Sequence, residues 1–240
     1  MGMDDREVRS EHFPTFAFQK IQGSSSLLIP DIDALTNAFY ENVFEDLVPY
    51  DTKLDKAIFV GSTTGTNHTV ETVRDMQNQR LRVAMFFKNS DQVDFRLPVI
   101  CQCLTLEAEE AIRDLGFGNG EQLTWDAQFR YKFLVSIDGN GATCSRVQIA
   151  LKSSSVLLKF DSPNNLYYFA GLQPYSHYLP VACEQDILTY IELEKSHPHY
   201  FSKIASNGQR FFEEYLNRES ASYYFSRLLS LYERTFQSKP

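Results

Sequence analysis

One stretch of the chain decides the fold: residues 131–160 read YKFLVSIDGNGATCSRVQIALKSSSVLLKF. The apolar run 131–137 predicts a buried strand, and the glycine-containing loop 138–146 follows it. VQIALK then predicts a helix, and SSSVLLKF predicts a second strand. A strand that returns through a helix to a parallel neighbour forms a βαβ unit, so we expect an α/β protein built on a parallel sheet.

The sequence on both sides of this unit continues the alternation of strands and helices. Further strands are expected at the apolar runs 56–60, 81–87 and 98–103. Helices are expected at 68–80, at 105–115 and from about residue 184 onward. Near the start, we expect two short strands within 13–29 and a helix from Pro30 to about residue 47.

Composition restricts the class of partner. The 240 residues are 43% hydrophobic and 22% charged, which is typical of a folded globular protein. The formal net charge of −8 gives no general attraction for nucleic acid or for an anionic membrane. We therefore expect no nucleic-acid partner, and any site for an anionic ligand must be a local cluster of basic groups.

The sequence also suggests a compartment. The opening MGMDDREVRSEHF is not a signal peptide, and no apolar run is long enough to form an integral membrane segment. Four cysteines without a CxxC pair predict free thiols. We therefore expect a soluble cytoplasmic protein, of a bacterium or, if viral, of the host cytoplasm.

The first candidate site is FVGSTTG, which ends the strand predicted at 56–60 and precedes a helix. Backbone N–H groups of such a turn and the positive end of the helix dipole favour an anion. A capped surface turn is the alternative interpretation. The candidate residues are Gly61, Ser62, Thr63, Thr64 and Gly65.

The second candidate site is DGNGATCSR, which joins the strand and the helix of the βαβ unit. Its two glycines allow the backbone to approach a ligand closely. Arg146 is poorly placed for the helix dipole, which suggests a bound anion that its guanidinium holds; a solvent-exposed arginine is the alternative. The candidate residues are Gly139, Gly141, Thr143, Ser145 and Arg146.

Three further groups have two interpretations each. In LQPYSHYLPV, residues Tyr175, His177 and Tyr178 form a ligand pocket or a structural core. Asp31 and Asp33 have the spacing of a metal-binding pair, but we favour helix capping, because they follow Pro30 at a predicted helix start. Asp4 and Asp5 are candidates for a general base or belong to a frayed terminus.

The segments KFLVSIDGNGATCSR, SSSVLLKFDSP and LYYFAGLQPYSHYLPV together resemble the CAP10 group, glycosyltransferase family 90, which includes lipopolysaccharide-modifying and protein O-glucosyltransferase-like enzymes. KAIFVGSTTG and the stretch 78–80 are similar to further motifs of that family, so the resemblance covers almost the whole chain. It implies a GT-B-like α/β fold of two Rossmann-like lobes, with an abbreviated N-terminal lobe and C-terminal helices packing back. The implied lobes are 1–54, completed by about 205–240, and 55–204.

The resemblance also implies an activity: inverting, metal-independent transfer of a sugar, xylose or glucose, from a UDP-sugar. No cofactor is implied, and the acceptor would be a glycan, a glycoprotein or a lipid-linked saccharide. The alternative is a nucleotide-sugar-binding or interaction protein of the same fold without turnover.

The resemblance assigns roles to individual residues. Asp4 or Asp5 would be the base, and Arg146 would stabilise the leaving group. Tyr175, His177 and Tyr178 would shape the sugar or acceptor pocket. The remaining donor-binding positions, besides the two loops above, would be Arg80, Asp94, Phe95 and Ser155.

Overall fold

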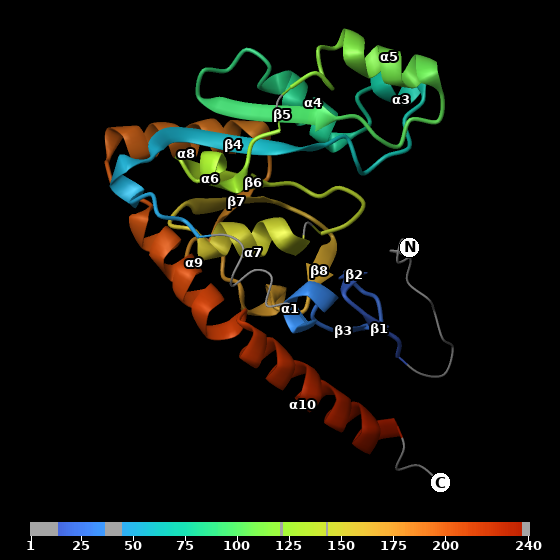
Figure 1. Ribbon diagram of the computed structural model, residues 1–240, viewed down its shortest axis with the longest axis vertical. Helices are drawn as coiled ribbons and strands as arrows, with labels where there is room; N and C mark the ends of the chain where they lie inside the picture. The colour runs from blue at the N-terminus through green and yellow to red at the C-terminus, as the bar shows by residue number, and fades with distance from the viewer. Residues whose placement is uncertain (1–13, 37–44, 121, 143, 237–240) are drawn as a thin grey trace.

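A five-stranded parallel sheet forms the centre of the computed structural model, which describes residues 14–36, 45–120, 122–142 and 144–236 (Figure 1). The strand order is β5-β4-β6-β7-β9, and every neighbouring pair is parallel. The strands are β4 (Leu54–Ser62), β5 (Val93–Val99), β6 (Tyr131–Ser136), β7 (Val156–Phe160) and β9 (Leu179–Val181). The predicted α/β class with a parallel sheet is confirmed.

The central strands are buried on both faces, as helices on both sides of a parallel sheet require. Successive residues alternate between two apolar clusters: Phe133 belongs to one cluster and Leu134 to the other. The Phe133 cluster includes residues of α4 (Gln79–Phe86) and α8 (Glu184–Ser196). The Leu134 cluster includes residues of α7 (Cys144–Lys152) and of the second half of α9 (Ser202–Tyr215).

Four helices begin at a residue whose side chain accepts a hydrogen bond from a backbone N–H of the first turn, which is the usual role of Thr or Asn at a helix start. Asn78 caps α4 in this way, through Leu81 N. The other caps are Thr69, Thr105 and Thr124, which begin α3 (Val70–Arg74), α5 (Leu106–Asp114) and α6 (Trp125–Gln128).

Two of the predicted strands are corrected by the structure. Residues 81–87 lie mostly in helix α4, because Asn78 caps a helix there and the helix is buried against the sheet. A short, continuously apolar run does not distinguish a buried helix from a strand. The strand predicted at 98–103 lies earlier, at Val93–Val99, and residues 100–104 form the loop that follows it.

The N-terminal strands lie beside the loops that follow the C-terminal ends of β6 and β7 (Figure 1). β2 (Gln19–Ile21) pairs antiparallel with β8 (Asn164–Leu166), and β1 (Phe16–Ala17) pairs in parallel with β3 (Leu27–Leu28). The remaining elements are α1 (Ile32–Thr36), η1 (Tyr50–Thr52), η2 (Phe169–Gly171) and α10 (Arg218–Phe236). Asp31 Oδ1 accepts a hydrogen bond from Ala34 N, 2.9 Å, which confirms the capping interpretation of this aspartate.

The long helix α10 extends away from the sheet and contacts α1 (Figure 1). The hydroxyl of Tyr224 donates a hydrogen bond to the carbonyl of Leu28, 2.9 Å, which attaches the helix to β3. Within the described residues, no helix combines the length and hydropathy needed to cross a bilayer. The division into lobes at residues 54 and 204 stays a prediction.

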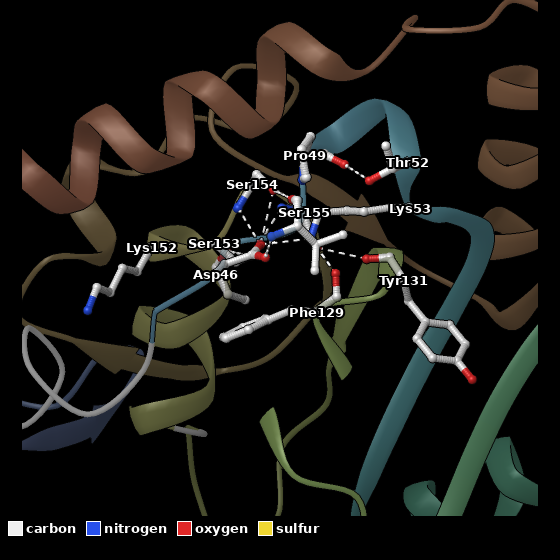
Figure 2. Close-up of polar contacts among 12 residues, drawn as sticks. Asp46, Pro49, Thr52, Lys53, Phe129, Tyr131, Lys152, Ser153, Ser154 and Ser155 are labelled. Carbon is white, nitrogen blue, oxygen red and sulfur yellow. Dashed lines mark hydrogen bonds and ion pairs between the residues drawn. The ribbon is translucent and has the colours of Figure 1, made fainter. Parts of the chain in front are cut away.

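A buried ion pair joins the N-terminal ends of three strands (Figure 2). Lys53 Nζ, just before β4, lies 2.7 Å from Asp46 Oδ2 and also donates to the carbonyl of Phe129, just before β6. The same carboxylate oxygen accepts from the backbone N–H and the hydroxyl of Ser154, just before β7. Burial lowers the pKa of Lys53, and Asp46 opposes that shift.

We predict that Asp46→Asn lowers the free energy of unfolding by about 3–5 kcal/mol, because it leaves a buried ammonium group without its counter-charge. The matched control is Glu109→Gln, which breaks the exposed ion pair with Arg113 and should change it by less than about 0.5 kcal/mol. Urea unfolding of both variants measures the difference. Equal stabilities would show that the buried pair does not hold the strand ends together.

Candidate functional site

The loops that follow β4 and β6 meet at the C-terminal edge of the sheet, where ligands bind in open α/β folds. Arg80, which is 6% exposed, joins them. Its Nε donates to the carbonyl of Asp138, and its Nη2 donates to that of Ile137, both 3.0 Å. Its Nη1 donates to the carbonyl of Ser62, 3.0 Å, and to Thr64 Oγ1, 2.7 Å. The structure thus places Arg80 at the predicted site with most of its N–H groups engaged by the protein.

Close backbone packing explains the glycines of both loops. Gly65 has φ +113°, and a Cβ there would lie 3.1 Å from the carbonyl oxygen of Gly139. A Cβ on Gly139 would lie 2.9 Å from Arg80 Nη2 and closer still to Thr64 Oγ1. The predicted loop glycines are therefore brought together, and Gly141 packs against the side chain of Gln19 from β2.

Gln102 is a residue of this site that the sequence does not reveal. It follows β5 and has φ +61°, in the left-handed region that residues other than glycine rarely adopt. Its Oε1 accepts from Gly65 N, 2.9 Å, and its Nε2 donates to Asn140 Oδ1, 2.9 Å. Gln102 thus connects the loops after β4, β5 and β6, and no sequence pattern indicates a strained glutamine.

Arg146 lies at the start of α7 and is partly buried between aromatic rings. Its guanidinium carbon is 4.5 Å from the ring centre of Phe59 and 5.1 Å from that of Trp125. Nη2 donates to the carbonyl of Val60, 2.6 Å. Burial, and then the charge of Arg80, lower the pKa of Arg146 to about 9, so the group remains charged at neutral pH.

A third cation, Lys159, interacts with Asp138, whose carbonyl accepts from Arg80, and the sequence motifs do not predict it. It lies on β7 with Nζ 4.8 Å from the ring centre of Phe169. Burial lowers the pKa of Lys159, while Asp138 and Asp161 oppose the shift. The carboxylate of Asp138 accepts hydrogen bonds from Ser162 Oγ and from Asn164 Nδ2. A lysine within the otherwise apolar run VLLKF is the available signal in the sequence.

We call Arg80, Arg146 and Lys159 the cation cluster. Among the described residues, neither arginine has a carboxylate within ion-pair distance. Cations that gather at a strand edge beside the first turn of a helix attract an anion, because the helix dipole adds to their charge. The arrangement is therefore suited to bind a phosphate or diphosphate group.

Other predicted residues of the first loop have structural contacts. Thr63 is buried, and its hydroxyl donates to the carbonyl of Cys101 and accepts from Cys101 N. Ser62 Oγ lies 3.4 Å from Thr64 Oγ1. Gly61 is needed because a Cβ there would lie 2.7 Å from the ring of Phe59. Ser145, in the second loop, is exposed in the first turn of α7.

Several predicted residues do not lie with the cation cluster. Ser155 precedes β7, and its hydroxyl donates to the carbonyl of Tyr131 at the opposite, N-terminal edge of the sheet (Figure 2). Asp94 accepts hydrogen bonds from Nε and Nη2 of Arg96, 2.7 Å each, and from the hydroxyl of Tyr131. Phe95 stacks on Phe59, with ring centres 4.5 Å apart, and so supports the ring beneath Arg146.

The three residues predicted to line the sugar pocket have different surroundings. His177 Nδ1 accepts from Gln173 N, 3.0 Å, and its ring lies 5.0 Å from that of Phe211. Tyr175 has φ +60° and is exposed, while Tyr178 packs against the Leu134 cluster. Asp4, Asp5 and Thr143 lie outside the described residues.

Comparison with known proteins identifies the family. Residues 12–240 match the family model "Glycosyl transferase family 90". Because the match covers most of the chain, the protein belongs to glycosyl transferase family 90, as the sequence motifs predict.

The chain is also similar, at low sequence identity, to individual proteins. The chain is 26% identical over 200 residues to "Uncharacterized protein 179R" of Invertebrate iridescent virus 6, covering 75% of this chain and 17% of that protein. It is 33% identical over 113 residues to "Protein O-glucosyltransferase 2" of Danio rerio, covering 47% and 22%. It is 26% identical over 168 residues to "Protein O-glucosyltransferase 3" of Homo sapiens, covering 70% and 32%.

The match to these relatives spans a third of their length or less. Among solved structures, the chain is similar to "Crystal structure of GtfA/B complex", with a TM-score of 0.41 and 13% identity, covering 78% of this chain and 38% of that one.

We predict that Gly139→Ala lowers the free energy of unfolding by about 1–3 kcal/mol, because the methyl group enters space held by Thr64 and by the pinned guanidinium of Arg80. Gly120→Ala is the matched control, since its nearest neighbour would be 3.9 Å away, and it should change stability by less than about 0.5 kcal/mol. Urea unfolding of both variants measures the difference in the free energy of unfolding. If Gly139→Ala proves as stable as the control, the two loops are not packed as described.

We predict that Gln102→Gly speeds hydrogen exchange of the Gly65 amide roughly tenfold, because that amide loses its nearer acceptor, Gln102 Oε1. Its second acceptor, Asn140 Oδ1 at 3.2 Å, loses the hydrogen bond from Gln102 Nε2 in the same variant. Global stability should change by less than about 1 kcal/mol, since removing the strained φ offsets the lost bonds. NMR exchange rates measure this, and the Leu81 amide, bonded to Asn78, is the internal control. An unchanged Gly65 rate would argue against the bridge.

Proposed function

We propose that this family 90 protein transfers a sugar, glucose or xylose, from a UDP-sugar to a hydroxyl group of a glycan, glycoprotein or lipid-linked saccharide. The observation that carries the proposal is the cation cluster at the C-terminal edge of the sheet, beside backbone amides of the α7 start. Such an edge suits the diphosphate of a nucleotide sugar. Family membership supports glycosyl transfer, and the names of the protein O-glucosyltransferase relatives favour glucose.

The proposed reaction is a single displacement that inverts the anomeric carbon. A base removes the proton of the acceptor hydroxyl, and the oxygen forms a bond to C1 of the donor sugar. The bond between C1 and the diphosphate oxygen breaks, and its electron pair leaves with the diphosphate as UDP. The leaving oxygen gains negative charge in the transition state, so a nearby fixed cation lowers the barrier.

The members of the cation cluster have different proposed roles. Arg146 uses one N–H on the carbonyl of Val60, and a guanidinium has five, so it retains donors for the diphosphate. Lys159 adds a second charge near the same edge. Arg80 already donates to four protein acceptors, so we propose that it positions the loops while its charge contributes at short range.

The base is proposed from the resemblance to be Asp4 or Asp5. The chain between these aspartates and β1 is roughly ten residues, which can span about 30 Å when extended. β2 packs Gln19 against Gly141, so the N-terminal strands lie beside the second loop, which supports this proposal. With arginine and lysine supplying the positive charge, we propose that the transfer needs no metal.

We predict that the chain binds UDP in the presence of EDTA and that Arg146→Met weakens binding roughly 10- to 100-fold, because a charged hydrogen bond is worth about 1.5–3 kcal/mol. Isothermal titration calorimetry measures the affinity. The control Arg82→Ala removes an exposed arginine of α4 and should bind UDP within about twofold of the wild type.

The same samples are then mixed with UDP-glucose, UDP-xylose, UDP-galactose or UDP-GlcNAc, and release of UDP is measured. Release from one donor that Arg146→Met abolishes would support the transferase. UDP binding without release would favour the non-catalytic nucleotide-sugar-binding alternative. Absence of UDP binding, or equal binding by Arg146→Met, would refute the proposed site.

A further inference from the structure

A second cavity lies away from the cation cluster, between residues 167–177 and the helices α9 and α10. Its volume is about 1270 Å³, which exceeds the roughly 300–1,000 Å³ of sites for drug-sized ligands. We call it the tyrosine groove after the five tyrosines that line it, which come from three separate segments. These are Tyr167, Tyr168, Tyr215, Tyr223 and Tyr224.

The groove combines a packed set of half-buried or buried rings with two rings that are exposed to solvent. Tyr167 lies 5.1 Å from Tyr168 and 5.2 Å from Tyr224, measured between ring centres. Tyr223 is 68% exposed and Tyr215 is 50% exposed. Apolar surface that lines a groove with polar residues around it marks a binding site more often than a single exposed ring does. Rings of this kind offer flat apolar faces, and their hydroxyls offer hydrogen bonds.

The rings are also held in place. The hydroxyl of Tyr224 donates to the carbonyl of Leu28, 2.9 Å, which fixes its ring against the N-terminal strands. The hydroxyl of Tyr167 is buried and makes no hydrogen bond to another described residue. Burial, and then Asp31 and Tyr224, raise the pKa of Tyr167, so it is a neutral donor at physiological pH.

The charges of the groove are balanced, unlike those of the cation cluster. Arg210 and Arg227 line it together with Glu214 and Glu219. Burial and then the charge of Arg210 lower the pKa of His177, which favours its neutral form. A balanced set of donors and acceptors around aromatic rings suits a neutral ligand with many hydroxyl groups, whereas phosphate or sulfate needs an excess of positive charge.

The groove is connected to the cation cluster by one short strand. Asn164, the first residue of β8, donates to the carboxylate of Asp138, whose carbonyl binds Arg80. Tyr167 follows directly after the end of β8. A ligand in the groove therefore lies next to the segment that borders the donor edge.

We propose that the tyrosine groove binds a neutral oligosaccharide, the part of the acceptor that lies beyond the hydroxyl receiving the sugar. The identification of this saccharide as the acceptor rests on the proposed function. Binding of a saccharide in the groove can be tested without any transfer reaction. A groove of this volume accommodates several sugar rings, with their apolar faces on the tyrosines and their hydroxyls bonded to the polar rim.

The test uses the full chain with hexamers of glucose, xylose and N-acetylglucosamine as neutral probes, and a heparin hexasaccharide as the anionic probe. Saturation-transfer NMR detects binding, and calorimetry gives the affinity. Tyr223→Ala removes an exposed ring and should weaken the best neutral probe roughly tenfold, which corresponds to about 1.4 kcal/mol. Tyr223→Phe keeps the ring and should retain most of the affinity.

Tyr200→Ala is the matched control, because Tyr200 is 58% exposed and does not line the groove. UDP affinity is measured on every variant and should be unchanged by the substitution of Tyr223. No binding of any neutral probe, equal loss in Tyr200→Ala, or stronger binding of the heparin fragment would overturn the proposal. If the protein binds a saccharide but not UDP, the proposal for the groove stands and the proposed donor site is refuted. The failure of one proposal can therefore be told apart from the failure of the other.

Discussion

The candidate site depends on one buried guanidinium, that of Arg80. A charge out of contact with water is stable only when hydrogen bonds replace its hydration. Arg80 meets this condition by binding the carbonyls of Ser62, Ile137 and Asp138, which belong to loops of two different strands. Asn78, at the start of the same helix, holds the neighbouring carbonyls of Thr63 and Thr64, 3.1 Å each. The loops are therefore shaped before a ligand arrives, which reduces the ordering that binding requires.

The buried cations at the two edges of the sheet differ in whether a carboxylate pairs with them. At the N-terminal edge, Lys53 is paired with Asp46, and Lys132 with Glu194 and Asp55, so each buried ammonium has its counter-charge. At the C-terminal edge, Arg146 rests on aromatic rings and has no described carboxylate within ion-pair distance. Paired charges stabilise the strand ends, whereas an unpaired cation retains its attraction for an anion. This contrast separates the part of the fold that supports stability from the part that supports the proposed chemistry.

The sequence is sufficient for the βαβ unit at 131–160, because a long apolar strand, a glycine loop and a helix leave few alternatives. It is insufficient for residues 81–87, where burial on all sides removes the periodicity that distinguishes a helix from a strand. The family motifs place Ser155 with the donor loops, yet it precedes β7, and in a parallel sheet the residues before a strand lie at the opposite edge from those after it. Gln102 is beyond prediction, because its role follows from a left-handed backbone and from two loops that only the fold brings together.

β8 joins the edge proposed to bind the donor to the tyrosine groove. Its first residue is bonded to the loop that Arg80 holds, and the residue after it is a tyrosine of the groove. β8 is itself held by antiparallel pairing with β2. A ligand that reaches both must present an anionic group at one end and a neutral face at the other, as a nucleotide sugar beside a neutral saccharide acceptor does. Under the proposed function, the three residue pairs that join β2 to β8 would fix the segment between the two proposed sites.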